Sequence, residues 1–319
     1  MFVPSAKRVA TRFCAVIAAC LPWFAVAGDS PATSNSGVVQ VSATAPSALA
    51  PANAVVLAYK FQPGQFVNYS GTNKIQYTTQ LARQTFQNVQ TNDTDTHFRV
   101  VSVDEQGLGL IEPVVDRTRM MAKVGDKPAV EFDSASSAET TPQFRAIRDA
   151  IGRPVARFQI TPTGKLVKAV IVDNSAPIEM RESAEKLETR FVFLPMLPST
   201  PVAVGEKWRE EYSTVVVNAG LKQPIPIRRI YELVSVADGI ATIKFKTLIM
   251  TPLNDVEMEK QLLQQTPVGT IEFDLNRGLV RSYRASIDRT AMNAFGSESL
   301  LKVTGESFEK LIAETAATK

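Results

Sequence analysis

The folded part of this chain has no cysteine. The only two cysteines, Cys14 and Cys20, lie within the first 27 residues. The rest of the chain therefore has no thiol, which excludes disulfides and cysteine nucleophiles there. Histidine is almost as scarce, because His97 is the only one. Zinc sites built from His and Cys need three or four such ligands, so we expect no metal, and we expect no cofactor.

Net charge is also missing once residues 1–27 are set aside. The whole chain has 35 Lys+Arg and 32 Asp+Glu. Three of the basic residues, Lys7, Arg8 and Arg12, lie in that leading stretch, so 35 less three leaves 32 residues of each sign. A chain without net positive charge or a long basic run has little electrostatic attraction for phosphates. We therefore expect no nucleic-acid partner.

Long apolar runs are absent too. The run near the start of the chain is too short for a resident transmembrane helix, and no later segment approaches the roughly 18 residues that such a helix needs. The apolar run Phe13–Phe24 follows basic residues and precedes Ala25-Val26-Ala27, which is the order of a secretory signal peptide. We expect cleavage after Ala27 and a secreted or periplasmic protein. Lipidation at Cys20 is the alternative, because Ile17–Cys20 resembles a lipobox. Cleavage is favoured because the residues after Cys20 stay apolar up to Ala27.

The sequence has no familiar catalytic motif. Nucleotide-binding glycine patterns, the H-E-x-x-H zinc motif and the G-x-S-x-G nucleophile elbow do not occur. His97 shares a strand face with Asp95 and is close to Asp93, so either acid could orient it. Because no serine in a nucleophile-elbow motif accompanies His97, we predict that it is a surface residue without a catalytic role.

Carboxylates near strand ends leave one enzymatic alternative open, a hydrolase with two converging acids. The candidates are Asp116, Asp133, Asp274 and Asp288. Asp274 is more readily explained as a turn residue, because an Asp side chain accepts hydrogen bonds from nearby backbone amides.

What the sequence does contain is a repeated hairpin pattern. Phe158–Asn174 alternates apolar and polar residues, turns at Gly164 and continues as a second strand, and Ile271–Asp288 does the same around Gly278. Glycine supplies the positive φ that such turns need. These two segments predict β-hairpins.

Two further units recur in the same order. The turn and strand Pro63–Phe66 resembles Val204–Trp208, and the Val-Ser-Val hairpin 98–111 resembles 231–243. The sequence therefore predicts an α+β fold, mainly antiparallel β, whose two related halves form a curved sheet or half-barrel covered by two or three helices.

The domain organisation follows from these patterns. Residues 1–27 are the predicted signal peptide, and residues 28–54, rich in Ala, Ser, Pro and Thr, are a predicted disordered linker. Residues 55–194 form the first β-rich half and residues 195–319 the second, and the two are also compatible with one compact unit. The three prolines of Leu194–Val204 suggest a linker between the halves.

Three helices are predicted, over residues 142–151, 176–194 and 255–265. In the second, apolar residues recur at helical spacing until Pro195. Core packing is the default for such a stripe. The alternative, that it covers a cavity, gains weight from a neighbouring strand that is apolar on both faces. The ligand-cavity candidates are Met180, Leu187, Phe191, Leu194, Val170 and Val172.

The turn openers and Val-Ser-Val hairpins resemble those of uncharacterised secreted bacterial proteins with a domain of unknown function, over about Val55–Leu311. The architecture more loosely resembles the periplasmic lipoprotein-carrier half-barrels. We expect an exported, non-enzymatic binding protein of the bacterial envelope that holds an apolar, lipid-like ligand or an envelope protein. The alternatives are a structural or protein-binding envelope module and a carboxylate-dependent hydrolase.

Overall fold

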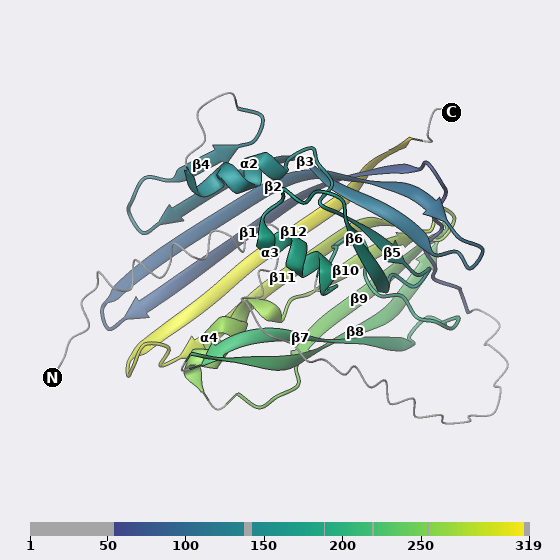
Figure 1. The fold of residues 1–319 in the computed structure, drawn as a ribbon. Coiled ribbons are helices and arrows are strands. Elements are labelled where there is room, and N and C mark those ends of the chain that lie inside the picture. The colour runs from purple at the N-terminus through teal and green to yellow at the C-terminus, as the bar shows by residue number, and fades with distance from the viewer. Residues whose placement is uncertain (1–53, 137–141, 188, 219, 254, 316–319) are drawn as a thin grey trace.

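The structure is a computed structural model that describes residues 54–136, 142–187, 189–218, 220–253 and 255–315. The predicted signal peptide lies outside the described residues, as does the predicted linker apart from Ala54. The described chain forms one antiparallel sheet with three short α-helices (Figure 1). The expected mainly antiparallel β architecture is therefore confirmed.

The sheet contains twelve strands. They are β1 (Phe66–Leu81), β2 (Gln84–Val103), β3 (Gly109–Val124), β4 (Val130–Asp133), β5 (Ala156–Ile160), β6 (Leu166–Ile171), β7 (Lys207–Asn218), β8 (Leu221–Ala237), β9 (Ile240–Ile249), β10 (Val268–Asp274), β11 (Leu279–Met292) and β12 (Ser299–Thr315). The helical elements are η2 (Pro142–Phe144), α2 (Arg145–Ala150), α3 (Ile178–Glu185), α4 (Val256–Leu262) and η3 (Leu263–Gln265).

The strands are ordered β6-β5-β3-β2-β1-β12-β11-β10-β9-β8-β7, with β4 paired to β3 at one side. Two meanders thus meet at the central pair β1–β12, and β6 and β7 are the two edges of an open sheet. Figure 1 shows that this sheet is strongly curved. Strands before and after the predicted boundary at residue 194 belong to the same sheet.

The two meanders open with the same hydrogen bonds. Gly64 N donates to Val100 O (2.8 Å) and Val100 N donates to Gln65 O (2.9 Å). In the second meander Gly205 N donates to Leu233 O (2.7 Å) and Leu233 N donates to Glu206 O (3.1 Å). The turn before each meander therefore pairs with the residue that directly precedes Val-Ser-Val in the second strand of that meander.

The Val-Ser-Val strands also have β-bulges at matching positions. The register shifts between Val100 and Ser102 in β2 and between Leu233 and Ser235 in β8. A bulge places one extra residue in a strand and bends it, so each meander curves at the same point. That the two halves are related remains a prediction, which these shared features motivate.

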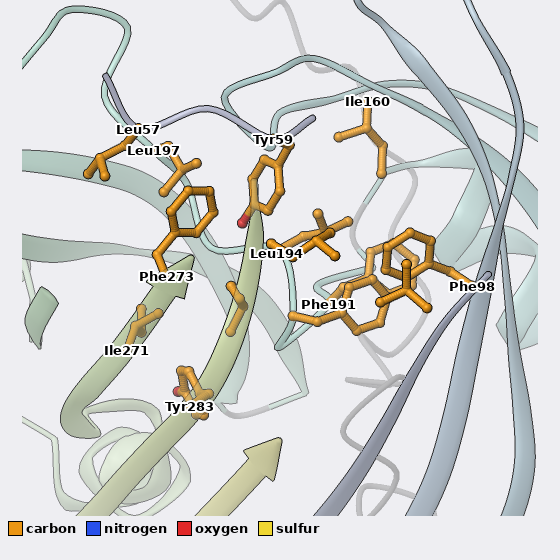
Figure 2. Close-up of a cluster of buried hydrophobic side chains, with 14 of the residues drawn as sticks. Leu57, Tyr59, Phe98, Ile160, Phe191, Leu194, Leu197, Ile271, Phe273 and Tyr283 are labelled. Atoms are coloured by element: carbon orange, nitrogen blue, oxygen red, sulfur yellow. The ribbon is translucent and has the colours of Figure 1, made fainter. Parts of the chain in front are cut away.

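The hydrophobic core lies on the inner face of the sheet, which we define as the face carrying Val67, Tyr69 and Phe98. Two irregular segments fill the space over this face, residues 55–61 and residues 189–202. Figure 2 shows Phe191 and Leu194 between Phe98 on one side and Phe273 on the other. The proline-rich segment, predicted to be a linker, is therefore part of the core.

The residues that fix the segment 189–202 are aromatic and aliphatic. Phe193 is 1% exposed and stacks on Tyr69 at 5.2 Å and on Phe98 at 5.1 Å between ring centroids. Leu197 is 3% exposed, and Val202 pairs with Val55 in an isolated bridge. Burying several large side chains stabilises the irregular backbone, at roughly 1.5–3 kcal/mol each.

The second predicted helix is much shorter than expected. Residues 176–194 were expected to be helical, but α3 ends at Glu185 and Leu187 has a φ of 55°. A leucine in the left-handed region cannot continue a right-handed helix. The reason lies in tertiary structure, because Phe191 and Phe193 are both buried in the aromatic core, stacked at 5.2 Å. A helix carries residues two positions apart about 200° apart around its axis, so it could not bury both.

The other two helix predictions agree with the structure. η2 and α2 cover residues 142–150, and Phe144 packs on Phe132 of β4 at 4.9 Å. The predicted N-cap of this helix, Thr141, lies outside the described residues. α4 and η3 cover residues 256–265, and Asp255 caps α4 by accepting a hydrogen bond from Glu257 N (2.7 Å).

Candidate functional site

The six predicted cavity residues do not form one group. Phe191 and Leu194 are 7% and 8% exposed and belong to the core, and Leu187 packs partly against it. Met180 is half-buried in α3. Val170 on the edge strand β6 is 45% exposed, and Val172 just after it is 37% exposed. The structure therefore brings Leu187, Phe191 and Leu194 to the core and leaves the two valines at the surface.

The segment 189–202 is tied firmly to the sheet on both sides. Tyr59 Oη donates to Pro195 O (2.9 Å), and Leu197 N donates to Thr163 O (2.8 Å) in the β5–β6 turn. On the other side, the indole of Trp208 on β7 donates to Met196 O (2.8 Å). Hydrogen bonds to the β5–β6 turn and to β7 thus hold the segment 189–202 in place as a cover over the end of the inner face that carries Phe98 and Phe273.

A charged network strengthens the same attachment. Arg190 forms an ion pair with Glu210 of β7, and its guanidinium lies 3.6 Å from the centre of the Tyr212 ring. The second Glu210 oxygen, Oε2, accepts a hydrogen bond from Tyr231 Oη (2.8 Å). Burial, together with the negative charge of Glu210, raises the pKa of Tyr231 above its ordinary value. The tyrosine is therefore a neutral donor at every physiological pH.

The network continues across β8 and β9 on the inner face. Arg229 Nε donates to Thr247 Oγ1 (3.1 Å), and its guanidinium lies 5.0 Å from the centre of the Phe245 ring. Phe245 stacks on Tyr283 of β11 at 5.3 Å. Burial raises the pKa of Tyr283. This part of the inner face thus combines aromatic rings with the positive charge of the half-buried Arg229.

The far end of the inner face has its own cover, formed by α4 and η3. Leu263 of η3 packs with Ala291 of β11 and with Val303 of β12, while Met258 and Leu262 of α4 reach β7 and β8. Tyr77 Oη of β1 donates to Gln264 Oε1 (2.7 Å). The helical elements therefore span the curve of the sheet at this end, and we call the group around Leu263 the far cluster.

Between the two covers, the inner face carries small and polar residues. We call these five half-exposed residues the central floor: Gly71 and Asn73 on β1, Ala285 on β11, and Gly305 and Ser307 on β12. The atoms nearest to a Cβ built on Gly71 all belong to β12, and those nearest to one on Gly305 belong to β1 and β11. The closest neighbours of both glycines are therefore strands of the sheet and not covering segments.

Two buried polar side chains border the central floor. Glu309 on β12 is 7% exposed and Thr94 on β2 is 5% exposed. Neither Glu309 Oε1 nor Thr94 Oγ1 has a hydrogen-bond partner among the residues that the structure describes. Burial raises the pKa of Glu309 to about 8. Buried polar atoms without partners are rare in proteins and often mark a place for a ligand or an ordered water.

The sequence contains a partial signal for these residues. In β1 the apolar alternation of Val67 and Tyr69 stops at Gly71, and in β12 an acid, Glu309, occupies the face that also carries Val303 and Leu311. Each interruption taken alone is ordinary. Only the cross-strand register, which pairs Gly71 with Glu309, brings them together.

The acidic candidates for catalysis have separate partners. His97 contacts Asp116, with Nδ1 2.8 Å from each carboxylate oxygen, and not Asp95 or Asp93. Asp133 binds Arg117, which holds the pKa of that carboxyl below its usual range. Asp288 pairs with Lys302 at 3.1 Å.

Asp274 acts as a turn residue, as predicted. Its Oδ1 accepts hydrogen bonds from Asn276 N and Arg277 N, each at 2.9 Å. The carboxylate-pair hydrolase required two of the four acids to meet, and the contacts found for them lead to different partners instead.

Within the described residues, no helix is long and apolar enough to cross a membrane. The same part of the chain holds no group of three or more His, Cys, Asp or Glu side chains arranged for a metal ion.

The fold and the site together define an open antiparallel sheet whose inner face is covered at both ends. Residues 177–280 match the model of a family of unknown function, DUF6263. The match runs from the N-terminus of α3 to the start of β11, and it confirms the expected resemblance to an uncharacterised family over this range. No curated protein matches the chain.

Several solved structures show partial similarity. A lipovitellin structure on lipid–protein interactions has a TM-score of 0.47 and 11% identity, and the alignment covers 81% of this chain and 26% of that one. This chain therefore spans about a quarter of the lipovitellin chain. The hypothetical lipoprotein YmcC from Escherichia coli (K12) has a TM-score of 0.23 and 10% identity, with coverages of 72% and 82%. The MucA/MucB complex of Pseudomonas aeruginosa has a TM-score of 0.12 and 7% identity, with coverages of 78% and 94%.

Proposed function

We propose that this protein is an exported, non-enzymatic binding protein that holds an apolar, lipid-like ligand on the central floor. The observation that carries the proposal is the pair Gly71 and Gly305, two half-exposed residues without side chains that lie on the inner face between the two packed ends. The ends themselves are packed with aromatic and aliphatic side chains. An acyl chain lying on the floor would continue this apolar layer and remove further apolar surface from water.

The sequence supports export, and the contacts of the candidate acids give no support to the carboxylate-pair hydrolase. The leading 27 residues have the order of a signal peptide, and the acids that could have formed a catalytic pair have other partners. Binding without chemistry requires only shape and apolar surface. The side chains of the central floor are small, and the apolar clusters at its two ends supply the apolar surface.

The test is ligand retention by purified protein. The chain would be expressed with its own leader, purified without detergent and examined by native mass spectrometry, and the extracted material would be identified by liquid chromatography–mass spectrometry. We expect a bound acyl-chain compound at a stoichiometry near one. Protein that carries none, and that takes up no diphenylhexatriene in a fluorescence titration, would contradict the proposal.

Two serine substitutions provide a matched pair. Ser307→Leu places a large side chain on the central floor, whereas Ser286→Leu makes the same change at an exposed position on the other face of β11. We expect Ser307→Leu to lose the ligand and Ser286→Leu to keep it. Equal retention by the two variants would exclude the central floor as the binding surface.

A further inference from the structure

Four residues form one row across the central strands. Thr94 on β2 pairs with Gly71 on β1, Gly71 pairs with Glu309 on β12, and Glu309 pairs with Tyr283 on β11. All four lie on the inner face. Because neighbouring strands are about 4.8 Å apart, Thr94 and Glu309 flank Gly71 at one strand spacing each.

The two flanking side chains are buried and incompletely bonded. Thr94 Oγ1 and Glu309 Oε1 lack a hydrogen-bond partner within the described chain, although both residues are more than nine-tenths buried. Leaving a buried donor or acceptor unsatisfied costs roughly 1–3 kcal/mol. Two such groups in one row indicate that the hydrogen bonds of Thr94 and Glu309 are satisfied only when another molecule supplies the partners.

Gly71 places no side chain between them. A Cβ at this position would lie 3.5 Å from Glu309 Oε2 and 3.4 Å from Phe308 O, which are ordinary contacts. The carboxyl group of Glu309 therefore leans toward Gly71. A small polar group resting on Gly71 would be within reach of the Glu309 carboxyl, and Thr94 borders the same space.

The charges facing Glu309 determine what it can bind. Its paired neighbours on the inner face are Gly71, which has no side chain, and Tyr283, which stays neutral. Arg284 and Lys310, the nearest basic residues along β11 and β12, are exposed on the other face. Burial alone raises the pKa of this carboxyl, to about 8, so at neutral pH the Glu309 carboxyl is protonated and can donate a hydrogen bond to a ligand.

We propose that Glu309 and Thr94 bind the uncharged oxygen-rich head of an acylglycerol-like amphiphile, whose acyl chain lies along the central floor. An ester carbonyl accepts a hydrogen bond from the Glu309 carboxyl, and a glycerol hydroxyl bonds to Thr94 Oγ1. The acyl chain runs over Gly71 and Gly305 to the far cluster, where Ile75 and Ile287 flank Gly305. The inference rests on the proposed function and specifies its ligand class.

The test compares two probes that differ in their head group. Diphenylhexatriene is apolar throughout, whereas 1-monoolein carries the ester and hydroxyl oxygens. Affinities of the purified, delipidated full chain for both would be measured at about pH 6.5 and about pH 9.5, on either side of the Glu309 pKa of about 8. We expect monoolein to bind roughly three- to tenfold more weakly at the higher pH, the effect of one lost hydrogen bond, and diphenylhexatriene to bind equally at both.

Variants then assign the effect to residues. Glu309→Gln keeps a donor that does not titrate, so its monoolein affinity should be the same at both pH values. Glu309→Leu and Thr94→Val should each weaken monoolein roughly three- to tenfold at about pH 6.5 without changing diphenylhexatriene binding. The unchanged apolar probe serves as the control for folding.

The outcomes separate the two proposals. If neither probe binds, the proposed function itself fails. If diphenylhexatriene binds and monoolein shows neither the pH effect nor sensitivity to Glu309→Leu and Thr94→Val, the head-group site is wrong while the apolar floor remains. A pH effect that persists in Glu309→Gln would also overturn the assignment to Glu309.

Discussion

The ring of Tyr59 lies directly against the backbone of Gly164, in the turn of the β5–β6 hairpin. A Cβ built on Gly164 would be 2.9 Å from Tyr59 Cε2 and 2.8 Å from Pro195 O, and Gly164 has a φ of +86°. The same turn accepts a hydrogen bond from Tyr59 N at Pro162 O (2.8 Å). One small residue thus lets the segments 55–61 and 189–202 close over the inner face together.

Gly164→Ala should therefore be strongly destabilising. The added methyl group meets a buried ring and a carbonyl oxygen, and the positive φ is unfavourable for alanine, so we expect a loss of about 3 kcal/mol in the free energy of unfolding. Gly152→Ala is the matched control, because its φ is +75° and nothing lies within 4 Å of the added Cβ. It should lose only about 1 kcal/mol in urea unfolding. Equal losses would mean that the contact with Tyr59 does not matter.

The ion pair between Arg190 and Glu210 should contribute measurably to holding the cover. The Glu210 side chain is 13% exposed and also accepts a hydrogen bond from Tyr231. A double-mutant cycle with Arg190→Ala and Glu210→Gln should give a coupling free energy of about 1–2 kcal/mol, typical of a partly buried charged pair.

The pair Lys207–Glu232 on β7 and β8 is the control for that cycle. Its atoms are 3.2 Å apart, but its side chains are 60% and 41% exposed. We expect a coupling below about 0.5 kcal/mol that vanishes in high salt. A coupling as large as that of the Arg190 pair would contradict the role of burial.

Glu309 should make stability decrease as the pH rises. Its pKa is raised from 4.5 to about 8 in the folded state, so between these values the folded protein binds a proton that the unfolded chain has lost. The stability is complete below about pH 4.5 and falls by up to about 1.4 kcal/mol per pH unit until about pH 8. Urea unfolding of the ligand-free wild type and of Glu309→Gln across this window measures the difference. Parallel curves for the two proteins would show that Glu309 does not titrate there.

Asp255 should support α4, the helix that covers the far end of the inner face. Its side chain accepts a hydrogen bond from Glu257 N at 2.7 Å. Asp255→Ala is expected to cost about 1 kcal/mol, and Asp255→Asn much less, because asparagine is an equally good cap. Asp288→Ala, which removes an exposed acid from β11, should change the free energy of unfolding by less than about 0.5 kcal/mol. Identical effects of Asp255→Ala and Asp255→Asn would rule out capping.

Local patterns predicted the elements that depend on local chemistry. The hairpins turn at Gly164 and Gly278, Asp274 caps its own turn, and Asp255 begins a helix. Each of these features is determined within a few residues, since a positive φ or a capping side chain acts on adjacent backbone groups.

Patterns failed where distant packing competes with local preference. The apolar spacing of Met180, Ala184 and Leu187 is helical, yet the chain leaves the helix before Leu187. The aromatic residues that follow gain more by filling the core than a further helical turn provides. For the same reason the proline-rich stretch, whose prolines favour extended backbone, packs as a core segment.

By itself, the sequence determined the alternating strands and the turn glycines, and, after residue 27, the absence of thiols and the balanced charge. Composition and short-range backbone preferences depend on each residue and its close neighbours. Only the tertiary structure decided that β1 pairs with β12, and hence that Gly71 lies between Thr94 and Glu309. Register between strands more than 200 positions apart depends on how the whole sheet curves and packs, so no local pattern contains it.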